Sequence, residues 1–179
     1  ADMGAVRKLK LATGQSVQIT KKKGIYRTPV FSPDGKTIVY RKEDGNDHQG
    51  FTHSKEPGIY TIPAAGGKPA FVTRQGEFPQ FNTDGTRIFV QTGGYLFGNL
   101  SKTMKSFKLD GSDEKTVFTT QYTNQFVPSP DNKWVAFTEL YKVYVAPMPL
   151  PGQPMGISAT TKAVPVAQVA RDAGINLHW

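Results

Sequence analysis

A short turn motif recurs along this chain at an almost constant spacing, and it constrains the fold more than any other feature. Residues 29–40 read PVFSPDGKTIVY, with Ser-Pro-Asp-Gly between two runs of alternating residues. Proline presets φ at the first turn position, aspartate bonds its own backbone and glycine accepts a positive φ, so the motif predicts a β-hairpin. The pattern returns as PQFNTDGTRIFV at 79–90 and as FVPSPDNKWVAF at 126–137, where asparagine replaces the glycine.

Two sequence features recur with the same period. The residue directly before the turn, which is Phe31 in the first copy of the motif, has its equivalents at 81, 128 and 179, with spacings of 50, 47 and 51. A short apolar run that ends in threonine or alanine, at 20, 73, 119 and 170, follows with spacings of 53, 46 and 51. Short strands without helical patterning between them favour the four-stranded antiparallel blades of a β-propeller over a parallel βαβ array.

The repeat phase divides the chain into blades. We predict an all-β fold in which residues 1–179 form a single partial propeller domain, with three complete blades and partial blades at both ends. The boundaries lie at about 5–20 for a half blade, at 24–74, 76–120 and 124–171 for the complete blades, and at 174–179 for a lone first strand. Propellers close with roughly four to eight blades. We therefore expect a segment of a larger ring, whose open blade edges could form a homo-oligomer; a small self-closing ring is the alternative.

The composition excludes several classes of function. The chain has no cysteine, which rules out disulfides, thiolate metal sites and a cysteine nucleophile. No apolar run approaches the roughly 20 residues of a membrane span, and the first residues, ADMGAVRKLK, show no signal peptide. The net charge is +8, but the only tight basic cluster, Lys21–Lys23, has no interleaved aromatic residues, so we predict no nucleic-acid partner.

The repeated turn residues are expected to be structural. Three carboxylates at equivalent positions could suggest acid–base chemistry, but their equivalence favours a turn that each closes once per blade. The predicted structural turn residues are Asp34, Gly35, Asp84, Gly85, Asp131 and Asn132.

Large aromatic residues recur in the repeat and are expected to pack between blades. They are Phe31, Phe81, Trp134, Phe137 and Trp179. The aromatic insert GGYLFGNL at 93–100 is less regular and could be an exposed contact.

One polar loop, EDGNDHQGFTH, is rich in residues that bind metals. Its candidate cation ligands are Asp44, Asp47, His48 and His53, with Glu56 close behind. The loop lacks a complete calcium-binding pattern and a closing bidentate glutamate. A solvated loop, or a loop that contacts another protein, is therefore the favoured interpretation.

No catalytic motif is present in the sequence. The three histidines, at 48, 53 and 178, form no H-x-H metal pair. The segments GQSVQ and GISAT lack the closing glycine of the G-x-S-x-G nucleophile motif. We therefore predict that this chain has no catalytic residue, no cofactor and no hydrolase activity of its own.

The recurring (F/Y)SPDG(K/T)xIxY unit, followed by IYTIPAAGGKPAFVT, resembles the TolB-like, WD-repeat-like propeller family over nearly the whole chain. The last third, from YKVYVAPMPLPGQPMG to the end, is most similar to the propeller that precedes a metal-dependent amidohydrolase barrel in cell-envelope hydrolases. The resemblance implies a non-catalytic propeller region that acts as a scaffold and gates substrate or docks a partner. It implies that the partners are the rest of the propeller and a downstream catalytic domain, which would hold any metal. It also implies a periplasmic or secreted location.

Two alternatives to this function stay open. TolB-like blades also occur in stand-alone protein-interaction modules of the bacterial envelope and in peptidases of the prolyl-oligopeptidase and tricorn types. The blade motif is specific for the fold and does not distinguish these proteins.

Overall fold

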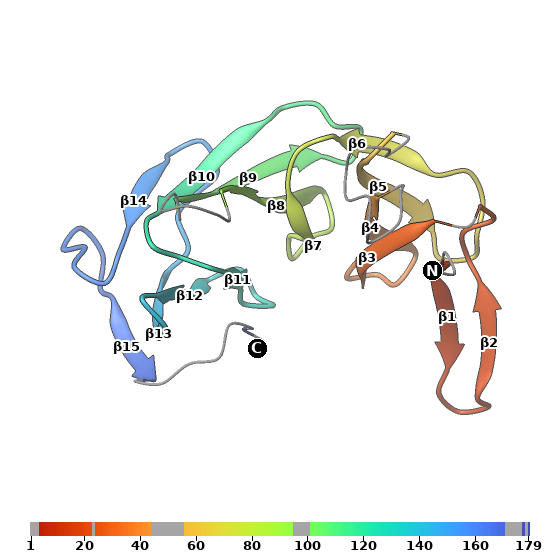
Figure 1. Cartoon of the computed structure of the whole chain (residues 1–179), viewed down its shortest axis with the longest axis horizontal. Coiled ribbons are helices and arrows are strands. Elements are labelled where there is room, and N and C mark those ends of the chain that lie inside the picture. Colours follow the sequence, from red (N-terminus) through yellow and green to blue (C-terminus); the bar gives the residue numbers. More distant parts are fainter. Residues whose placement is uncertain (1–3, 23, 44–55, 95–100, 171–176, 178) are drawn as a thin grey trace. The chain divides into compact units, whose positions relative to one another are not determined.

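The computed structural model describes residues 4–22, 24–43, 56–94, 101–170, 177 and 179. These residues form fifteen β-strands and no helix, which confirms the predicted all-β class (Figure 1). Within this part of the chain, no helix is long and apolar enough to cross a membrane. The chain divides into two compact units: the first comprises residues 1–88 and 107–112, and the second residues 89–106 and 113–179.

The first unit begins with a two-stranded antiparallel sheet, β1 (Arg7–Lys10) and β2 (Gln15–Gln18). A four-stranded sheet follows, with the order β3-β4-β5-β6 and antiparallel neighbours throughout. Its strands are β3 (Ile25–Phe31), β4 (Thr37–Glu43), β5 (Gly58–Pro63) and β6 (Ala70–Thr73).

Two further sheets follow along the chain. The strands of the next sheet are β7 (Glu77–Phe81), β8 (Arg87–Gly93), β9 (Lys102–Lys108) and β10 (Lys115–Thr120). The last sheet, in the second unit, has the order β11-β12-β13-β15 and is antiparallel. Its strands are β11 (Phe126–Pro128), β12 (Trp134–Glu139), β13 (Lys142–Pro147) and β15 (Ala167–Ala170). Successive four-stranded antiparallel sheets confirm the predicted blade architecture.

A fifth strand, β14 (Met155–Ile157), was not predicted from the sequence. It lies in the long connection between β13 and β15 and extends the sheet to the order β14-β10-β9-β8-β7. β14 runs parallel to β10, with Met155 opposite Phe118. Three residues in a segment rich in proline and glycine carry no period-2 signal, so the sequence gives no indication of this strand.

The first strand of each of the three larger sheets carries a proline, at Pro29, Pro79 and Pro128. Each of these strands is the end strand of its sheet. Proline cannot donate a hydrogen bond to a neighbouring strand, so within a sheet it occurs mainly in edge strands. The prolines thus mark the strand with which each blade begins.

Each unit has its own hydrophobic core. In the first unit the buried cluster consists of Val6, Ile19, Ile38, Tyr40, Ile62 and Ala64. In the second unit it consists of Phe89, Met104, Val117, Phe118, Phe126, Val135, Phe137, Tyr144, Ala146 and Ile157. Burial of Ile157 in this cluster holds β14 in place, since the Ile157 side chain is only 1% exposed.

An aromatic row crosses the first four-stranded sheet, one ring from each strand. The centroid distances are 5.4 Å from Tyr26 to Tyr40, 6.1 Å from Tyr40 to Tyr60, and 5.4 Å from Tyr60 to Phe71. Burial raises the pKa of the Tyr40 hydroxyl, so this group stays protonated. Cross-strand aromatic pairs of this kind stabilise a sheet.

The prediction that the five repeated aromatic residues form the core was wrong for three of them. Phe137 is fully buried and Phe81 is half-buried, but Phe31, Trp134 and Trp179 are 49%, 44% and 55% exposed. Trp134 lies on the face of β12 opposite to Phe137, and Phe31 ends an edge strand that has a neighbour on one side only. The repeat fixes a residue's place along a strand, but it does not determine which sheet face is covered.

In both units, the connection between the third and fourth strands of one sheet lies against the fourth strand of the sheet before it. In the first unit, Gly111 of the β9–β10 turn packs so closely on β6 that a Cβ atom there would lie 2.2 Å from the Val72 carbonyl oxygen. In the second unit, the β13–β15 connection contributes β14 to the edge of β10. This packing is a tertiary feature that the repeat pattern did not indicate.

Candidate functional site

The Ser-Pro-Asp turns have nearly identical geometry in the two units. Asp34 Oδ1 accepts hydrogen bonds from Ser32 Oγ at 2.6 Å and from the Lys36 amide at 3.0 Å. Asp131 Oδ1 accepts from Ser129 Oγ at 2.6 Å and from the backbone amide two residues further on at 3.1 Å. Each carboxylate therefore closes its own turn.

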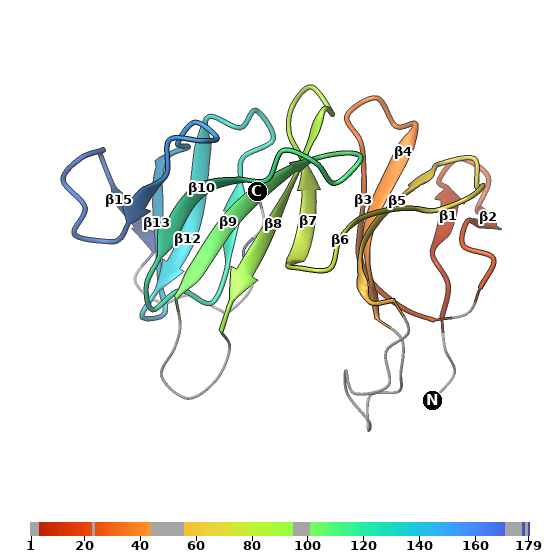
Figure 2. The ribbon, with the colours of Figure 1, turned by 90° about the horizontal axis from the view of Figure 1, so that it is seen from above.

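The third predicted turn uses a different hydroxyl. Asp84 Oδ1 accepts from the amide and the hydroxyl of Thr86, at 2.9 and 2.5 Å. The turn positions after the aspartates have positive φ, with 69° at Gly35, 72° at Gly85 and 54° at Asn132. The turns after β3 and β7 lie beside each other at one edge of the first unit (Figure 2), where a Cβ on Gly85 would be 3.4 Å from Pro33 Cδ.

These hydrogen bonds also set the charge of the carboxylates. The Ser32 hydroxyl, followed by the Lys36 amide, lowers the pKa of Asp34, and the Ser129 hydroxyl does the same for Asp131. The Thr86 hydroxyl lowers the pKa of Asp84. A carboxylate that is held in its ionised form and occupied by turn donors is poorly suited to proton transfer near neutral pH.

The four candidate metal ligands, Asp44, Asp47, His48 and His53, lie outside the described residues, so that hypothesis stays a prediction. Glu56, just after them, is described, and its backbone carbonyl accepts a hydrogen bond from the Tyr60 hydroxyl at 2.9 Å. Within the described ranges, no three His, Cys, Asp or Glu side chains are grouped in a way that could hold a metal ion.

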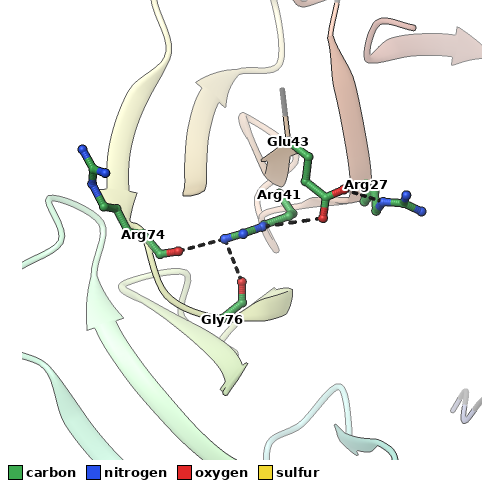
Figure 3. A network of polar contacts seen from close by, with 5 residues as sticks. All are labelled: Arg27, Arg41, Glu43, Arg74 and Gly76. Atoms are coloured by element: carbon green, nitrogen blue, oxygen red, sulfur yellow. Dashed lines mark hydrogen bonds and ion pairs between the residues drawn. The ribbon is translucent and has the colours of Figure 1, made fainter. Parts of the chain in front are cut away.

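A polar network in the first unit joins β3, β4 and the connection from β6 to β7 (Figure 3). Arg41 Nη1 donates to the backbone carbonyls of Arg74 and Gly76, at 2.9 and 3.1 Å. Glu43 accepts from Arg27 Nε at 2.8 Å, and its other oxygen lies 3.9 Å from Arg41 Nε. The Arg41 and Glu43 side chains are 11% and 9% exposed, whereas that of Arg27 is 57% exposed. Arg41 thus fastens one sheet to the segment that begins the next.

The same position carries a polar residue in the other two blades, where Gln91 contacts the connection after its sheet, as Arg41 does, whereas Thr138 contacts the connection before its sheet. Gln91 lies 50 residues after Arg41, and its amide group donates to the Asn124 carbonyl at 3.1 Å and accepts from the Phe126 amide at 3.2 Å. Thr138 lies 47 residues further on, and its hydroxyl accepts from the Asn124 amide at 3.2 Å. In all three blades, a polar side chain in the second strand satisfies backbone groups of a connection between sheets.

Sequence reasoning missed these three residues. Arginine, glutamine and threonine share no residue type, so no motif marks them. The signal that was available is their place in the repeat, because spacings of 50 and 47 are also those of the turn motif. A polar residue that directly follows the three apolar residues of the second strand, at the same phase in each repeat, predicts a buried hydrogen-bonding role.

A strained residue precedes the proline in two of the first strands. Thr28 and Phe78 occupy equivalent positions, with φ of 47° and 50°. The ladder between β3 and β4 shifts register at this point, between Arg27 and Val30. A bulge of this kind interrupts pairing at a sheet edge and re-aims the neighbouring side chains.

A shallow hollow lies between two turns of the first unit. It measures about 410 Å³ and is lined by Thr86, Arg87, Lys108, Leu109 and Asp110. The Ser112 hydroxyl lowers the pKa of the Asp110 carboxylate, which it contacts at 2.6 Å. The lining combines two cationic side chains with one carboxylate and offers no paired nucleophile and base.

Comparison with known proteins defines the fold. No family model matches the sequence, and no curated protein matches it. An oligogalacturonate lyase in complex with manganese is similar at a TM-score of 0.62 and 16% identity, over 93% of this chain and 42% of that one. TolB from Acinetobacter baumannii is similar at 0.54 and 20% identity, over 83% and 38%. Hydrazine synthase from Kuenenia stuttgartiensis is similar at 0.52 and 16% identity, over 80% and 46%.

The chain has a TolB-like β-propeller fold, which confirms the fold that the turn repeat predicted. At identities of 20% or less, the likeness shows the fold alone. The chain spans between 38% and 46% of the length of these three solved proteins.

Proposed function

We propose that this chain is the non-catalytic part of a larger TolB-like propeller, in which it acts as a scaffold and gates substrate or docks a partner for a hydrolase of the amidohydrolase type. The observation that carries the proposal is the two-stranded sheet β1–β2. Every other sheet has four or more strands in the described part of the chain. A two-stranded sheet leaves ladder groups unpaired on its outer edges, and these groups favour pairing with further strands.

The side chains of this sheet support the same proposal. Leu9 lies opposite Ser16, and Val17 lies opposite Lys8, so the two apolar residues face opposite sides of the hairpin. Leu9, Leu11 and Val17 are 55%, 89% and 54% exposed. Apolar groups on both faces are expected on a sheet that packs between neighbours in a longer array.

The proposed partners follow from this arrangement. They are the rest of the propeller and a catalytic domain that would hold any metal ion, in a periplasmic or secreted protein. The open edges could also pair two copies of this chain. In the three solved proteins of similar fold, more than half of the length lies outside the matched region, which accords with the proposal.

A second candidate is a stand-alone interaction module, which the likeness to TolB from Acinetobacter baumannii favours. The coding sequence that follows Trp179 distinguishes the two. A completed propeller followed by an H-x-H motif supports the hydrolase, a stop after the propeller supports the module, and a G-x-S-x-G motif supports a peptidase.

Light scattering of the purified chain at micromolar concentration tests the open edges directly. We expect dimers or larger species, and less association in a Leu9→Lys/Val17→Lys variant, because a charge on each face opposes sheet packing. Leu150→Lys is the matched control, since Leu150 is also exposed, at 66%, but lies far along the chain from the hairpin. A natural chain that stays monomeric would contradict the proposed edge pairing.

A further inference from the structure

The strand β1 has a neighbour on one side only, although its place in the repeat is an inner one. In each of the three larger sheets the third strand lies between two neighbours: β5 between β4 and β6, β9 between β8 and β10, and β13 between β12 and β15. Among the described residues, β1 pairs with β2 alone. One edge of β1 therefore carries backbone groups with which a further strand can pair.

Two contacts in the first unit identify β1 and β2 as the third and fourth strands of a blade. The connection from β5 to β6 lies against the segment after β2, where a Cβ on Gly66 would be 3.8 Å from the Ile19 carbonyl oxygen. Lys8 Nζ, in β1, donates to the Ala64 carbonyl of the same connection at 2.8 Å. The later sheets also bring this connection against the fourth strand of the sheet before. The neighbour that β1 lacks is therefore a second strand, which runs antiparallel to the third, as β4 does to β5 and β12 to β13.

The charge on and around β1 is strongly positive. Between Met3 and Pro33 the sequence contains seven lysine or arginine residues and no aspartate or glutamate. Three of the four residues of β1 are cationic, and two of them, Arg7 and Lys10, are exposed. Arg7 Nε donates to a serine hydroxyl of β2 at 2.9 Å, but in the described part of the chain no cation of β1 pairs with a carboxylate. By contrast, Lys105 of the third strand β9 contacts a glutamate carboxylate at 2.6 Å.

We propose that β1 accepts an antiparallel strand whose acidic residues lie opposite Arg7 and Lys10. Side chains directly opposite each other in antiparallel strands have Cβ atoms about 4.5–5.5 Å apart, so opposite charges there attract and like charges repel. Leu9 lies between them and is 55% exposed, which favours an apolar residue opposite it. Lys8 is already bound to the Ala64 carbonyl and places no demand on the incoming strand. The expected pattern of that strand is acidic, apolar, any residue, acidic.

This inference rests on the proposed function, because the strand belongs to the rest of the propeller, and it adds the chemistry of that strand. Fluorescence anisotropy of labelled eight-residue peptides with the full chain tests it. Three probes carry Glu-Val-Thr-Glu, Gln-Val-Thr-Gln or Lys-Val-Thr-Lys between identical flanks. We expect the acidic peptide to bind about fivefold more tightly than the neutral one, because it adds two exposed charge pairs, and added salt should reduce this preference. The basic peptide should bind more weakly than the neutral one.

A fourth probe separates strand pairing from attraction by charge alone. It is the acidic peptide with N-methyl groups on the amides that face β1, so it keeps the charge but cannot donate hydrogen bonds to the strand. We expect it not to bind.

Charge reversal of β1 provides the sharpest variant. Arg7→Glu/Lys10→Glu should bind the basic peptide more tightly than the acidic one, a result that a misfolded hairpin cannot produce. Lys21→Glu/Lys22→Glu is the matched control, because it changes the net charge by the same amount at two exposed residues outside β1. It should keep the preference for the acidic peptide.

The outcomes distinguish this inference from the proposed function on which it rests. Equal affinity of the natural chain for the acidic and neutral peptides would overturn the inference and leave the open edge intact. Equal binding of the N-methylated peptide would also overturn it, since charge alone would then explain the binding. If no peptide binds, the edge of β1 does not accept a strand, and the proposed function loses its supporting observation as well.

Discussion

Arg41 offers the sharpest test of how the sheets are fastened together. Replacing it with methionine keeps the volume and the apolar stem of the side chain but removes the guanidinium. The carbonyls of Arg74 and Gly76 then lose their common donor, while Glu43 keeps its ion pair with Arg27. Replacing it with glutamine instead restores one amide group, as found at the equivalent position 91.

The magnitude follows from the environment of each lost contact. A part-buried carbonyl left without a donor costs about 1–3 kcal/mol, while a carbonyl that water can reach costs less. The Gly76 contact is part-buried and the Arg74 contact is exposed. The contact between Arg41 and Glu43 is long, at 3.9 Å, and adds little. We therefore expect Arg41→Met to lower the free energy of unfolding by about 2 kcal/mol, and Arg41→Gln by roughly half as much.

Guanidinium denaturation measures both variants. Far-ultraviolet circular dichroism follows the strands of both units, and the emission of Trp134 and Trp179 follows the second unit alone. The circular dichroism transition should shift to lower denaturant in both variants, and the shift should be larger for Arg41→Met than for Arg41→Gln. A methionine variant as stable as the natural chain, or a glutamine variant less stable than the methionine variant, would refute the role assigned to Arg41.

Two further predictions concern the turns. Gly111→Ala should lower the free energy of unfolding by roughly 2 kcal/mol or more, because its Cβ would lie 2.2 Å from the Val72 carbonyl oxygen at a φ of 83°. Gly14→Ala, at a φ of 68° with open space around it, should cost only about 1 kcal/mol, and equal losses in denaturant melts would exclude a steric cause. Because the folded pKa values of Asp34 and Asp131 are lowered, the stability they confer is present above about pH 4 and is lost as the pH falls through those lowered values. In acid titrations, Asp34→Asn/Asp131→Asn should therefore reduce the pH dependence of stability, and an unchanged acid limb would contradict this assignment.

The local parts of the fold could be predicted from the sequence because their causes are local. A Ser-Pro-Asp-Gly turn depends on the φ of proline, a carboxylate within reach of its own backbone and a residue that accepts a positive φ. Asn132 satisfies the last condition as the glycines do, with a φ of 54°. The period of these turns then leaves room for four short strands in each repeat, and thus indicates the blade architecture.

The candidate site could be predicted only in part. Asp34, Asp84 and Asp131 were recognised as turn residues, since a repeated motif marks them. Arg41 and Gln91 were not, because their partners are backbone groups 33 to 35 residues further along the chain. No local pattern identifies a hydrogen bond of that separation.

The sequence by itself therefore determined the turns, the strands and the repeat, all of which arise from interactions between residues close in the chain. Only the tertiary structure decided which faces are covered. It buried Phe137 while leaving Trp134, three residues away, 44% exposed, and it placed β14 at the edge of β10. The physical reason is that burial and edge pairing depend on which sheet lies alongside, and alternation along a strand defines two faces without indicating which of them meets a neighbour.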